Sequence, residues 1–238
     1  MICTFLPVTD TSTEAEPTAF AQRRYEVPPG ATDLLLVRHG ASQPYVDGTS
    51  FALVDGHGDP PLSFDGQEQA RQVSARLAAA GVDAIYVTNL RRTAETAAPL
   101  AARLGLELRV EPDLREVYLG EWEGGIFRKN VANGHPVSLR MAAEERWDVI
   151  PGAESSAALN SRVRAAIERI AAAHPGQRVA AFTHGGVIGA ALALASGSRP
   201  FAFLGAENTS ISRLVLTTDR WYVRGFNDTA HLAGVAAG

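Results

Sequence analysis

The sequence predicts an α/β fold: a three-layer α/β/α sandwich around a mostly parallel sheet with one antiparallel edge. Short apolar runs alternate with stretches of helical periodicity, as they do where helices connect parallel strands. Near the C-terminal end, residues 210–216 and 221–226 alternate in polarity on either side of a Thr-Thr-Asp-Arg turn and predict a hairpin at the sheet edge. A length of 238 residues suits one domain with a substantial core.

The predicted domain covers residues 31–238 and follows an N-terminal tail. Residues 1–30 are rich in Thr, Pro, Glu and Ala without periodicity, which predicts a poorly ordered segment. The continuous apolar run from Leu34 to Val37 then predicts a strand that is buried on both faces. Residues 41–61 contain several glycines and no periodicity, so we expect a loop that crosses the end of the sheet.

The next elements alternate between helix and strand. Ser63 is a predicted N-cap for a helix that stops at Gly81, and residues 84–87 form the second strand. Thr88 or Asn89 is expected to cap the helix that follows. That helix runs from about residue 90 to 105, and residues 106–110 alternate as a third strand.

The second half of the chain repeats this alternation after a mixed segment, residues 113–152. A helical stretch at residues 139–147 within it is expected to act as a lid. Residues 155–174 carry an apolar helical stripe, and residues 178–182 form a fourth buried strand. An apolar helix follows to about Ser196.

Composition excludes several classes of protein. Hydrophobic residues make up 46% and charged residues 20%, as in soluble globular proteins, and the net charge of −4 predicts no nucleic-acid partner. The sequence contains no run of about 18 apolar residues, so we expect no transmembrane helix. Cys3 is the single cysteine, and no Cys/His pair has zinc-ligand spacing, so we expect a cytoplasmic protein without metal or cofactor.

Two histidines occupy equivalent places in the predicted sheet. His39 and His184 each follow a buried strand, and each is followed by glycine. Because open α/β sheets bind ligands at the carboxyl ends of their strands, we expect both imidazoles to face one crevice. One strand-end histidine is more often structural, but the pair, with Arg38 adjacent, indicates a functional site. The other histidines in predicted loops or at a helix end are expected in solvent: His57, His135 and His174.

These histidines belong to a series of ordered motifs. The series comprises Leu36-Val37-Arg38-His39-Gly40, Pro61-Leu62-Ser63, Thr88-Asn89-Leu90-Arg91-Arg92-Thr93, Leu114-Arg115-Glu116, Gly120-Glu121-Trp122-Glu123-Gly124, Pro151-Gly152-Ala153-Glu154-Ser155 and Thr183-His184-Gly185-Gly186. Over residues 33–230 the chain resembles the histidine phosphatase superfamily, which includes the cofactor-dependent phosphoglycerate mutases. The resemblance implies a phosphoglycerate mutase-like fold.

The resemblance also implies a role for each matching residue. His39 is the phosphoryl acceptor, and Glu116 matches the proton donor of the family. The phosphate pocket is formed by Arg38, Arg92 and His184. After Gly40 the sequence departs from the family pattern, and Ser42 or Gln43 is expected to contact a phosphate oxygen there.

The chemistry of these side chains suits those roles. A nucleophilic imidazole must be unprotonated, and nearby guanidinium groups lower the pKa of His39 in the empty site. The planar guanidinium of Arg38 or Arg92 can bind two phosphate oxygens at once, whereas Lys offers a point charge. A carboxylic acid at position 116 can protonate the leaving alkoxide and later accept a proton from water.

The sequence therefore predicts a metal-independent phosphatase that acts on a small phosphorylated metabolite. A phosphoglycerate mutase is the alternative within the same chemistry. The segment between Gly124 and Pro151 is shorter than the mutase insert, which favours hydrolysis because a mutase must exclude water from its phosphohistidine. A non-catalytic phosphate- or nucleotide-binding module is a third, weaker hypothesis. The sequence leaves open the natural substrate and whether the chain forms a homodimer.

Overall fold

A computed structural model describes residues 20–233, so most of the predicted tail lies outside the described residues. Its central feature is a six-stranded sheet with the strand order β5-β4-β6-β1-β7-β8. The strands are β1 (Thr32–Arg38), β4 (Ala84–Val87), β5 (Leu108–Val110), β6 (Arg178–Thr183), β7 (Ile211–Leu216) and β8 (Trp221–Asp228).

The register of the sheet places the two histidine-bearing strand ends side by side. β1 runs parallel to β6, with Arg38 opposite Thr183, and β6 runs parallel to β4. On its other side β1 pairs antiparallel with β7, which continues antiparallel to β8. The prediction of a mostly parallel sheet with an antiparallel hairpin edge is confirmed.

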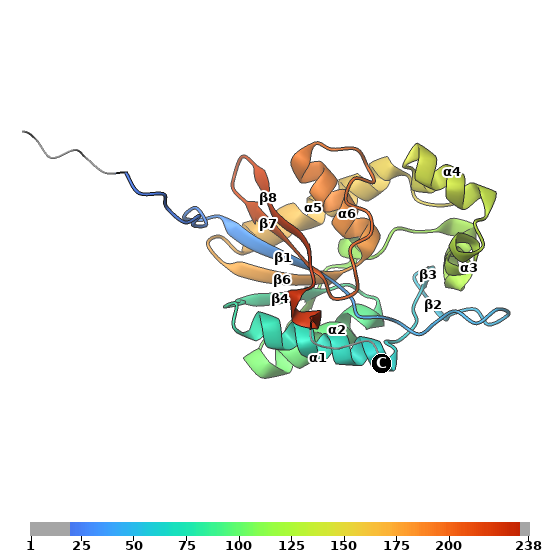
Figure 1. The fold of residues 1–238 in the computed structure, drawn as a ribbon, viewed down its shortest axis with the longest axis horizontal. Coiled ribbons are helices and arrows are strands. Elements are labelled where there is room, and N and C mark those ends of the chain that lie inside the picture. Colours follow the sequence, from blue (N-terminus) through green and yellow to red (C-terminus); the bar gives the residue numbers. More distant parts are fainter. Residues whose placement is uncertain (1–19, 234–238) are drawn as a thin grey trace, which may run out of the picture.

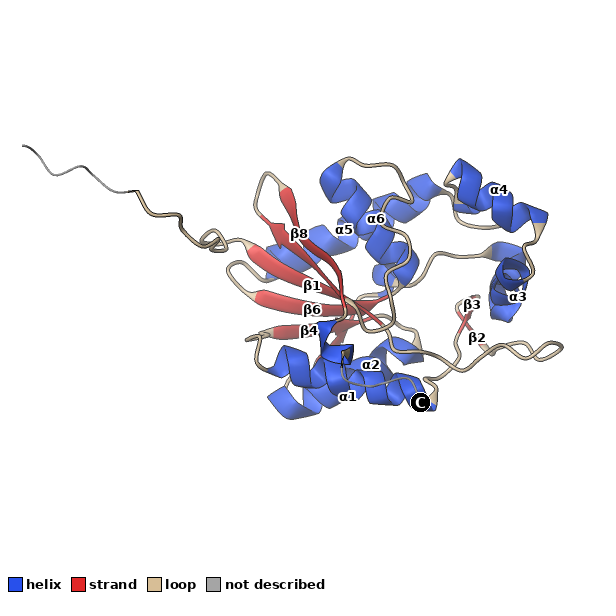
Figure 2. Cartoon of the chain, viewed as in Figure 1, coloured by secondary structure: helices blue, strands red, loops and turns tan. Residues whose placement is uncertain are grey.

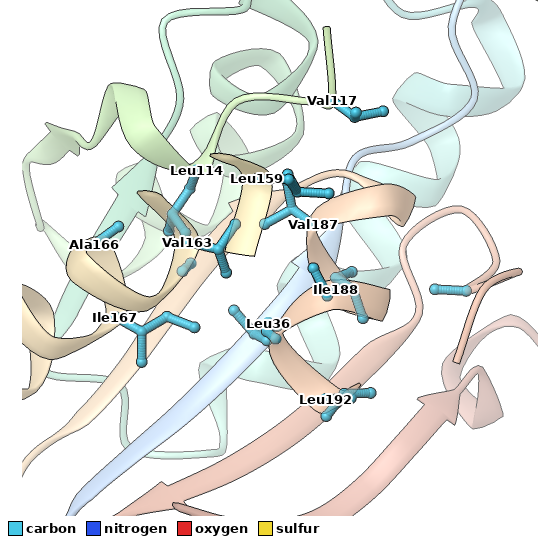
Figure 3. Packing of buried hydrophobic residues seen from close by; sticks show 14 of the residues in the cluster. Leu36, Leu114, Val117, Leu159, Val163, Ala166, Ile167, Val187, Ile188 and Leu192 are labelled. Atoms are coloured by element: carbon cyan, nitrogen blue, oxygen red, sulfur yellow. The ribbon is translucent and has the colours of Figure 1, made fainter. Parts of the chain in front are cut away.

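Helices cover both faces of this sheet, as Figures 1 and 2 show. One layer contains α1 (Phe64–Ala78) and α2 (Arg91–Leu104), and the other contains α5 (Ser156–Ala173) and α6 (Gly185–Ser196). Successive side chains of β1 point to opposite faces, so Leu35 and Val37 join the α1–α2 core while Leu34 and Leu36 join the α5–α6 core. Figure 3 shows Leu36 facing residues of α5 and α6.

Capping follows the predicted pattern at α1 and departs from it at α2. Ser63 Oγ accepts a hydrogen bond from Gly66 N and caps α1, as predicted. The prediction that Thr88 or Asn89 caps α2 is wrong: the N-cap is Leu90, without a side-chain hydrogen bond. The Thr88 hydroxyl accepts a hydrogen bond from Leu90 N just before the helix and also contacts the His184 ring in the core, so it makes a local and a tertiary contact.

The segments between these elements gather at the carboxyl end of β1 (Figure 1). The loop after β1 contains a small hairpin of β2 (Leu53–Val54) and β3 (His57–Gly58), which the sequence did not predict. Residues 112–149 form one expected helix, α4, displaced toward the N-terminus by three residues, and several unexpected short ones. These elements are η1 (Pro112–Leu114), η2 (Gly120–Gly125), α3 (Ile126–Ala132), α4 (Pro136–Glu144) and η3 (Trp147–Val149). The chain ends with η4 (Ala230–Leu232).

Within residues 20–233, no helix is both long enough and apolar enough to cross a membrane.

Candidate active site

A cavity of about 220 Å³ opens at the carboxyl ends of β1 and β6. Four of the six predicted site residues line it: Arg38, His39, Arg92 and Glu116. His184 lies directly behind His39, with 5.1 Å between the two ring centroids. The structure therefore brings together residues from four separate segments of the chain: Arg38 with His39, Arg92, Glu116 and His184.

His39 is held in one orientation and one tautomer. Its side chain is 6% exposed, and Nδ1 lies 2.7 Å from the carbonyl oxygen of Gly40. Because a carbonyl can only accept, Nδ1 carries the proton and Nε2 keeps its lone pair. Burial, reinforced by the charges of Arg92 and Arg38, holds the pKa of His39 well below its usual range. The ring is therefore neutral near pH 7, as a nucleophile requires.

His184 is fully buried, and its two ring nitrogens differ in their surroundings. Nε2 lies 3.2 Å from Thr88 Oγ1, while Nδ1 has no hydrogen-bond partner among the residues that the structure describes. Burial and the charge of Arg92 lower the pKa of His184 well below its usual range, and His39 adds to this effect. Nδ1 is therefore the ring atom with capacity for an added ligand.

The two predicted arginines are anchored by backbone carbonyls. Arg38 Nη1 donates to Ala206 O at 2.6 Å, and its buried Nε has no partner within residues 20–233. Arg92 Nη1 donates to Gly58 O on β3 at 2.9 Å and lies 3.8 Å from Asp59 Oδ1. Neither guanidinium is neutralised by a closely hydrogen-bonded carboxylate, so both retain positive charge and donors for an anion.

The neighbouring arginine has a different environment. Arg91 forms an i,i+4 ion pair with Glu95 at 2.9 Å, and its side chain is 55% exposed. The Arg92 side chain, by contrast, is 8% exposed. Helical geometry points consecutive side chains about 100° apart, so only the second of the pair faces the cavity.

Glu116 reaches the cavity from an irregular segment after η1. Its Oε1 accepts a hydrogen bond from Val117 N at 2.9 Å, and its Oε2 accepts one from Gly186 N at 3.4 Å. A Cβ atom at position 186 would stand 2.6 Å from Glu116 Oε1, so the glycine allows the carboxylate to approach α6. The first turn of α6 thus presents both His184 and a donor for this carboxylate.

Arg128 on α3 is a cavity residue that the sequence did not reveal. Its Nη1 donates to Gln43 O and its Nη2 to Ser42 Oγ, both at 2.7 Å. Both partners are uncharged, so a third guanidinium adds positive charge to the cavity. Ser42 itself does not line the cavity; its hydroxyl holds Arg128 instead. No periodicity or motif in the segment 126–132 could have indicated this contact.

Aromatic side chains also line the cavity. They are Phe51, Trp122, Phe127 and Trp147, and ring centroids in the series Trp122, Phe127, Trp147 are 6.3 and 6.2 Å apart. The cavity lining therefore combines guanidinium groups with a cluster of apolar rings.

Two histidines are less exposed than the sequence suggested. His57 was expected in solvent, but it is 5% exposed, lines the cavity and packs against the Tyr118 ring. His174, also expected in solvent, is buried, and its Nε2 lies 3.1 Å from both Tyr86 Oη and Arg109 Nη1. Both expectations are wrong because tertiary packing covers a strand residue and a helix end that local pattern left open.

Among the described residues, no group of three or more histidine, cysteine, aspartate or glutamate side chains is placed to hold a metal ion.

Residues 34–229, which include all of these cavity residues, match the model of the histidine phosphatase superfamily, branch 1. The chain belongs to this superfamily. The resemblance found in the motifs and the predicted phosphoglycerate mutase-like fold are thereby confirmed.

Relatives within the superfamily have different names. The chain is 33% identical to phosphoglycerate mutase-like protein 4 of Arabidopsis thaliana, covering 84% of this chain and 86% of the relative. It is 30% identical to a metal-independent phosphoserine phosphatase of the same plant, with 86% and 84% covered. The native structure of a mycobacterial glucosyl-3-phosphoglycerate phosphatase superposes with a TM-score of 0.70 at 28% identity, covering 84% and 100%. Family membership thus establishes the superfamily, while the named activities and substrates belong to those relatives.

Proposed function

We propose that this protein is a phosphatase that hydrolyses a small phosphorylated metabolite through a phosphohistidine on His39. The observation that carries the proposal is the buried, neutral imidazole of His39, whose Nδ1 proton is committed to Gly40 O. Its Nε2 lone pair is then available to phosphorus, with Arg38 and Arg92 beside it. The names of two relatives, a phosphoserine phosphatase and a glucosyl-3-phosphoglycerate phosphatase, support hydrolysis.

In the first step, His39 Nε2 forms a bond to phosphorus while the bond between phosphorus and the ester oxygen breaks. Glu116, protonated for this step, gives its proton to the leaving oxygen, so the alcohol departs neutral. Arg38 and Arg92 neutralise the phosphoryl oxygens, and His184, whose ring centroid lies 5.1 Å from that of His39, is the second imidazole beside them. The charge that builds up in the transition state is thus met by donors already fixed in place.

In the second step, water attacks the phosphohistidine. Glu116 takes a proton from the water, the bond from His39 Nε2 to phosphorus breaks, and inorganic phosphate leaves with Glu116 protonated again. The cavity of about 220 Å³ is smaller than most drug-sized ligand sites, which supports a small substrate. The predicted contact of Ser42 with a phosphate oxygen stays a prediction, since Ser42 Oγ is bonded to Arg128.

The test measures phosphate release from 4-nitrophenyl phosphate in the presence of a chelator. The His39→Ala variant is expected to lose activity by about 10⁴-fold or more, because the covalent route disappears. His135→Asn is the matched control: His135 is an exposed N-cap on α4, and Asn preserves capping. Acid-labile incorporation of labelled phosphate into the unmodified chain but not into His39→Ala would identify the intermediate. Equal activity of both variants would contradict the proposal.

Phosphoglycerate mutase activity is the second candidate. Arg128 adds a cation beyond the phosphate-facing pair, which would suit a substrate with a second anionic group, and one relative is named as mutase-like. Interconversion of 2- and 3-phosphoglycerate in the presence of 2,3-bisphosphoglycerate would establish it. Phosphate release without interconversion would leave hydrolysis as the activity, and tight phosphate binding without any turnover would support the non-catalytic alternative.

A further inference from the structure

A partly buried ion pair holds the segment that carries Glu116, and neither of its residues lines the cavity. Arg162 on α5 binds Glu154 in a bidentate manner, with Nε to Oε1 at 2.7 Å and Nη2 to Oε2 at 2.8 Å. Their side chains are 12% and 13% exposed. Charge-assisted, two-point contacts of this kind fix the orientation of a guanidinium as well as its position.

The remaining donors of Arg162 all go to the backbone that leads to Glu116. Nη1 donates to Asp113 O at 2.7 Å and to Arg115 O at 2.8 Å, and Nη2 donates to Glu116 O at 3.0 Å. A guanidinium has five N–H groups, and together with the two bonds to Glu154 all five are used. One side chain therefore fixes three carbonyls of the four residues from Asp113 to Glu116.

Glu154 completes the arrangement on the other side of Glu116. Glu154 N donates to Tyr118 O at 2.9 Å, and Tyr118 N donates to Glu154 Oε2 at 3.3 Å. Arg162 therefore holds the chain up to residue 116, and Glu154 holds it at residue 118.

The segment needs such support because it has no regular secondary structure. Residues 115–119 belong to no helix or strand, so no backbone ladder fixes the direction of the Glu116 side chain. α5, in contrast, is anchored by the buried side chains of Leu159 and Val163 on either side of Arg162. Figure 3 shows Leu114 beside Val163, so the same helix also packs against the start of the segment.

We propose that the Arg162–Glu154 pair is a positioning device for Glu116, which holds its carboxyl group where it can protonate the leaving oxygen. The proposal rests on the proposed function, in which Glu116 is the proton donor. Neither Arg162 nor Glu154 lines the cavity, so both act through Glu116. A purely structural pair would instead change only the amount of folded protein.

The choice of Arg at position 162 follows from its geometry. Lys carries the same charge but has three donors on a single nitrogen, so it cannot reach Glu154 and three carbonyls at once. Arg162→Lys therefore keeps the buried charge balanced while it releases the segment. Glu154→Gln is a second variant, which keeps the shape of the side chain and removes one half of the bidentate contact.

Arg169→Lys provides the matched control. Arg169 lies on the same face of α5, two turns further along, and its Nη2 binds Glu111 at 2.8 Å and Asp113 at 2.7 Å. Its hydrogen bonds go to the carboxylates of Glu111 and Asp113, and none goes to the backbone of residues 115–118. Arg169→Lys therefore tests whether weakening another ion pair of α5 is enough to change the kinetics.

The experiment compares kcat/KM for ethyl phosphate, whose alkoxide must be protonated as it leaves, with kcat/KM for 4-nitrophenyl phosphate, whose phenolate leaves readily. For Arg162→Lys we expect about a 100-fold loss with ethyl phosphate and less than about a threefold loss with 4-nitrophenyl phosphate. Glu154→Gln should change the ratio in the same direction, and Arg169→Lys should leave it unchanged. Circular dichroism checks that each variant is folded.

Glu116→Gln separates failure of this proposal from failure of the proposed function. If Glu116→Gln shows the selective loss with ethyl phosphate but Arg162→Lys and Glu154→Gln lower both substrates equally, the pair is structural and the positioning proposal is overturned. If Glu116→Gln shows no selectivity, the acid role of Glu116 is wrong, and the positioning proposal falls with it. Adding Arg162→Lys to Glu116→Gln should cause no further loss with ethyl phosphate, because both changes remove one function.

Discussion

The two sides of the cavity differ in how they are built. The phosphate side consists of residues at or near strand ends and in the first turn of α2, anchored by the core: Arg38, His39, Arg92 and His184. The lid side comes from the loop after β1 and from short helices and turns: Phe51, Trp122, Phe127, Arg128 and Trp147. His39 and Arg92 are each 6% exposed and His184 is fully buried, whereas Arg128 is exposed. In the proposed reaction, the groups beside phosphorus are held by strand ends and by the start of α2, whereas the groups that would meet the rest of the substrate are carried by loops and short helices.

Substitutions on the phosphate side are therefore expected to affect the reaction with every substrate, and substitutions on the lid side are expected to affect the choice of substrate. Residues that neutralise charge in the transition state act on every phosphate ester. Residues on the lid side can distinguish only substrates that differ beyond the phosphate. Three predictions test this division, in order of decreasing effect.

The largest effect is expected on the phosphate side. Arg92→Lys should lower kcat/KM by about 10²- to 10³-fold for every phosphate ester, because Lys cannot replace a two-point contact with phosphoryl oxygens. Arg91→Lys, which changes only the exposed pair with Glu95, is the control and should have no effect. Steady-state kinetics with several esters checks both. A loss that varies strongly from ester to ester would break the division between the two sides.

The second prediction concerns pH and the two buried imidazoles. Their pKa values are lowered in the folded chain, so above about pH 6.5 neither state takes up a proton there. Below that pH the unfolded chain binds protons that the folded chain does not, and stability falls as pH falls. Each histidine contributes a slope of about 1.4 kcal/mol per pH unit to the free energy of unfolding.

Urea unfolding between pH 5 and 7 measures this slope. The His39→Asn variant should show a slope that is shallower by the contribution of one histidine. An unchanged slope in His39→Asn would show that His39 is protonated in the fold, against its assignment as a neutral nucleophile.

The smallest effect is expected on the lid side. Arg128→Met should raise KM about tenfold for 3-phosphoglycerate, which carries a carboxylate, because an unpaired cation beside the cavity is lost. KM for 4-nitrophenyl phosphate, which has no second anionic group, should stay the same. Lys129→Met is the neighbouring control, since Lys129 binds Asp47 at the surface. Equal changes with both esters would place Arg128 on the phosphate side.

Much of the fold could be predicted because the signals are local. The apolar run from Leu34 to Val37 and the stripe of α5 record burial directly in the chain, and Ser63 caps α1 as expected. The cap of α2 was predicted wrongly, because the N-cap is Leu90, while the Thr88 hydroxyl contacts both Leu90 N and the His184 ring, 96 residues away. The contact with His184 leaves no trace in the sequence near Thr88.

The sequence alone determined the phosphate side: two strand ends that each deliver a histidine, with Arg38 adjacent, must meet once the strands pair in parallel. The motifs also identified Arg92 and Glu116. The other groups around these residues became known from the folded chain alone. Arg128 binds Ser42, 86 residues away, and Arg162 binds the carbonyl of Glu116, 46 residues away. The physical reason is that strand and helix periods are written in neighbouring residues, whereas a contact between loops depends on how the whole core places their ends.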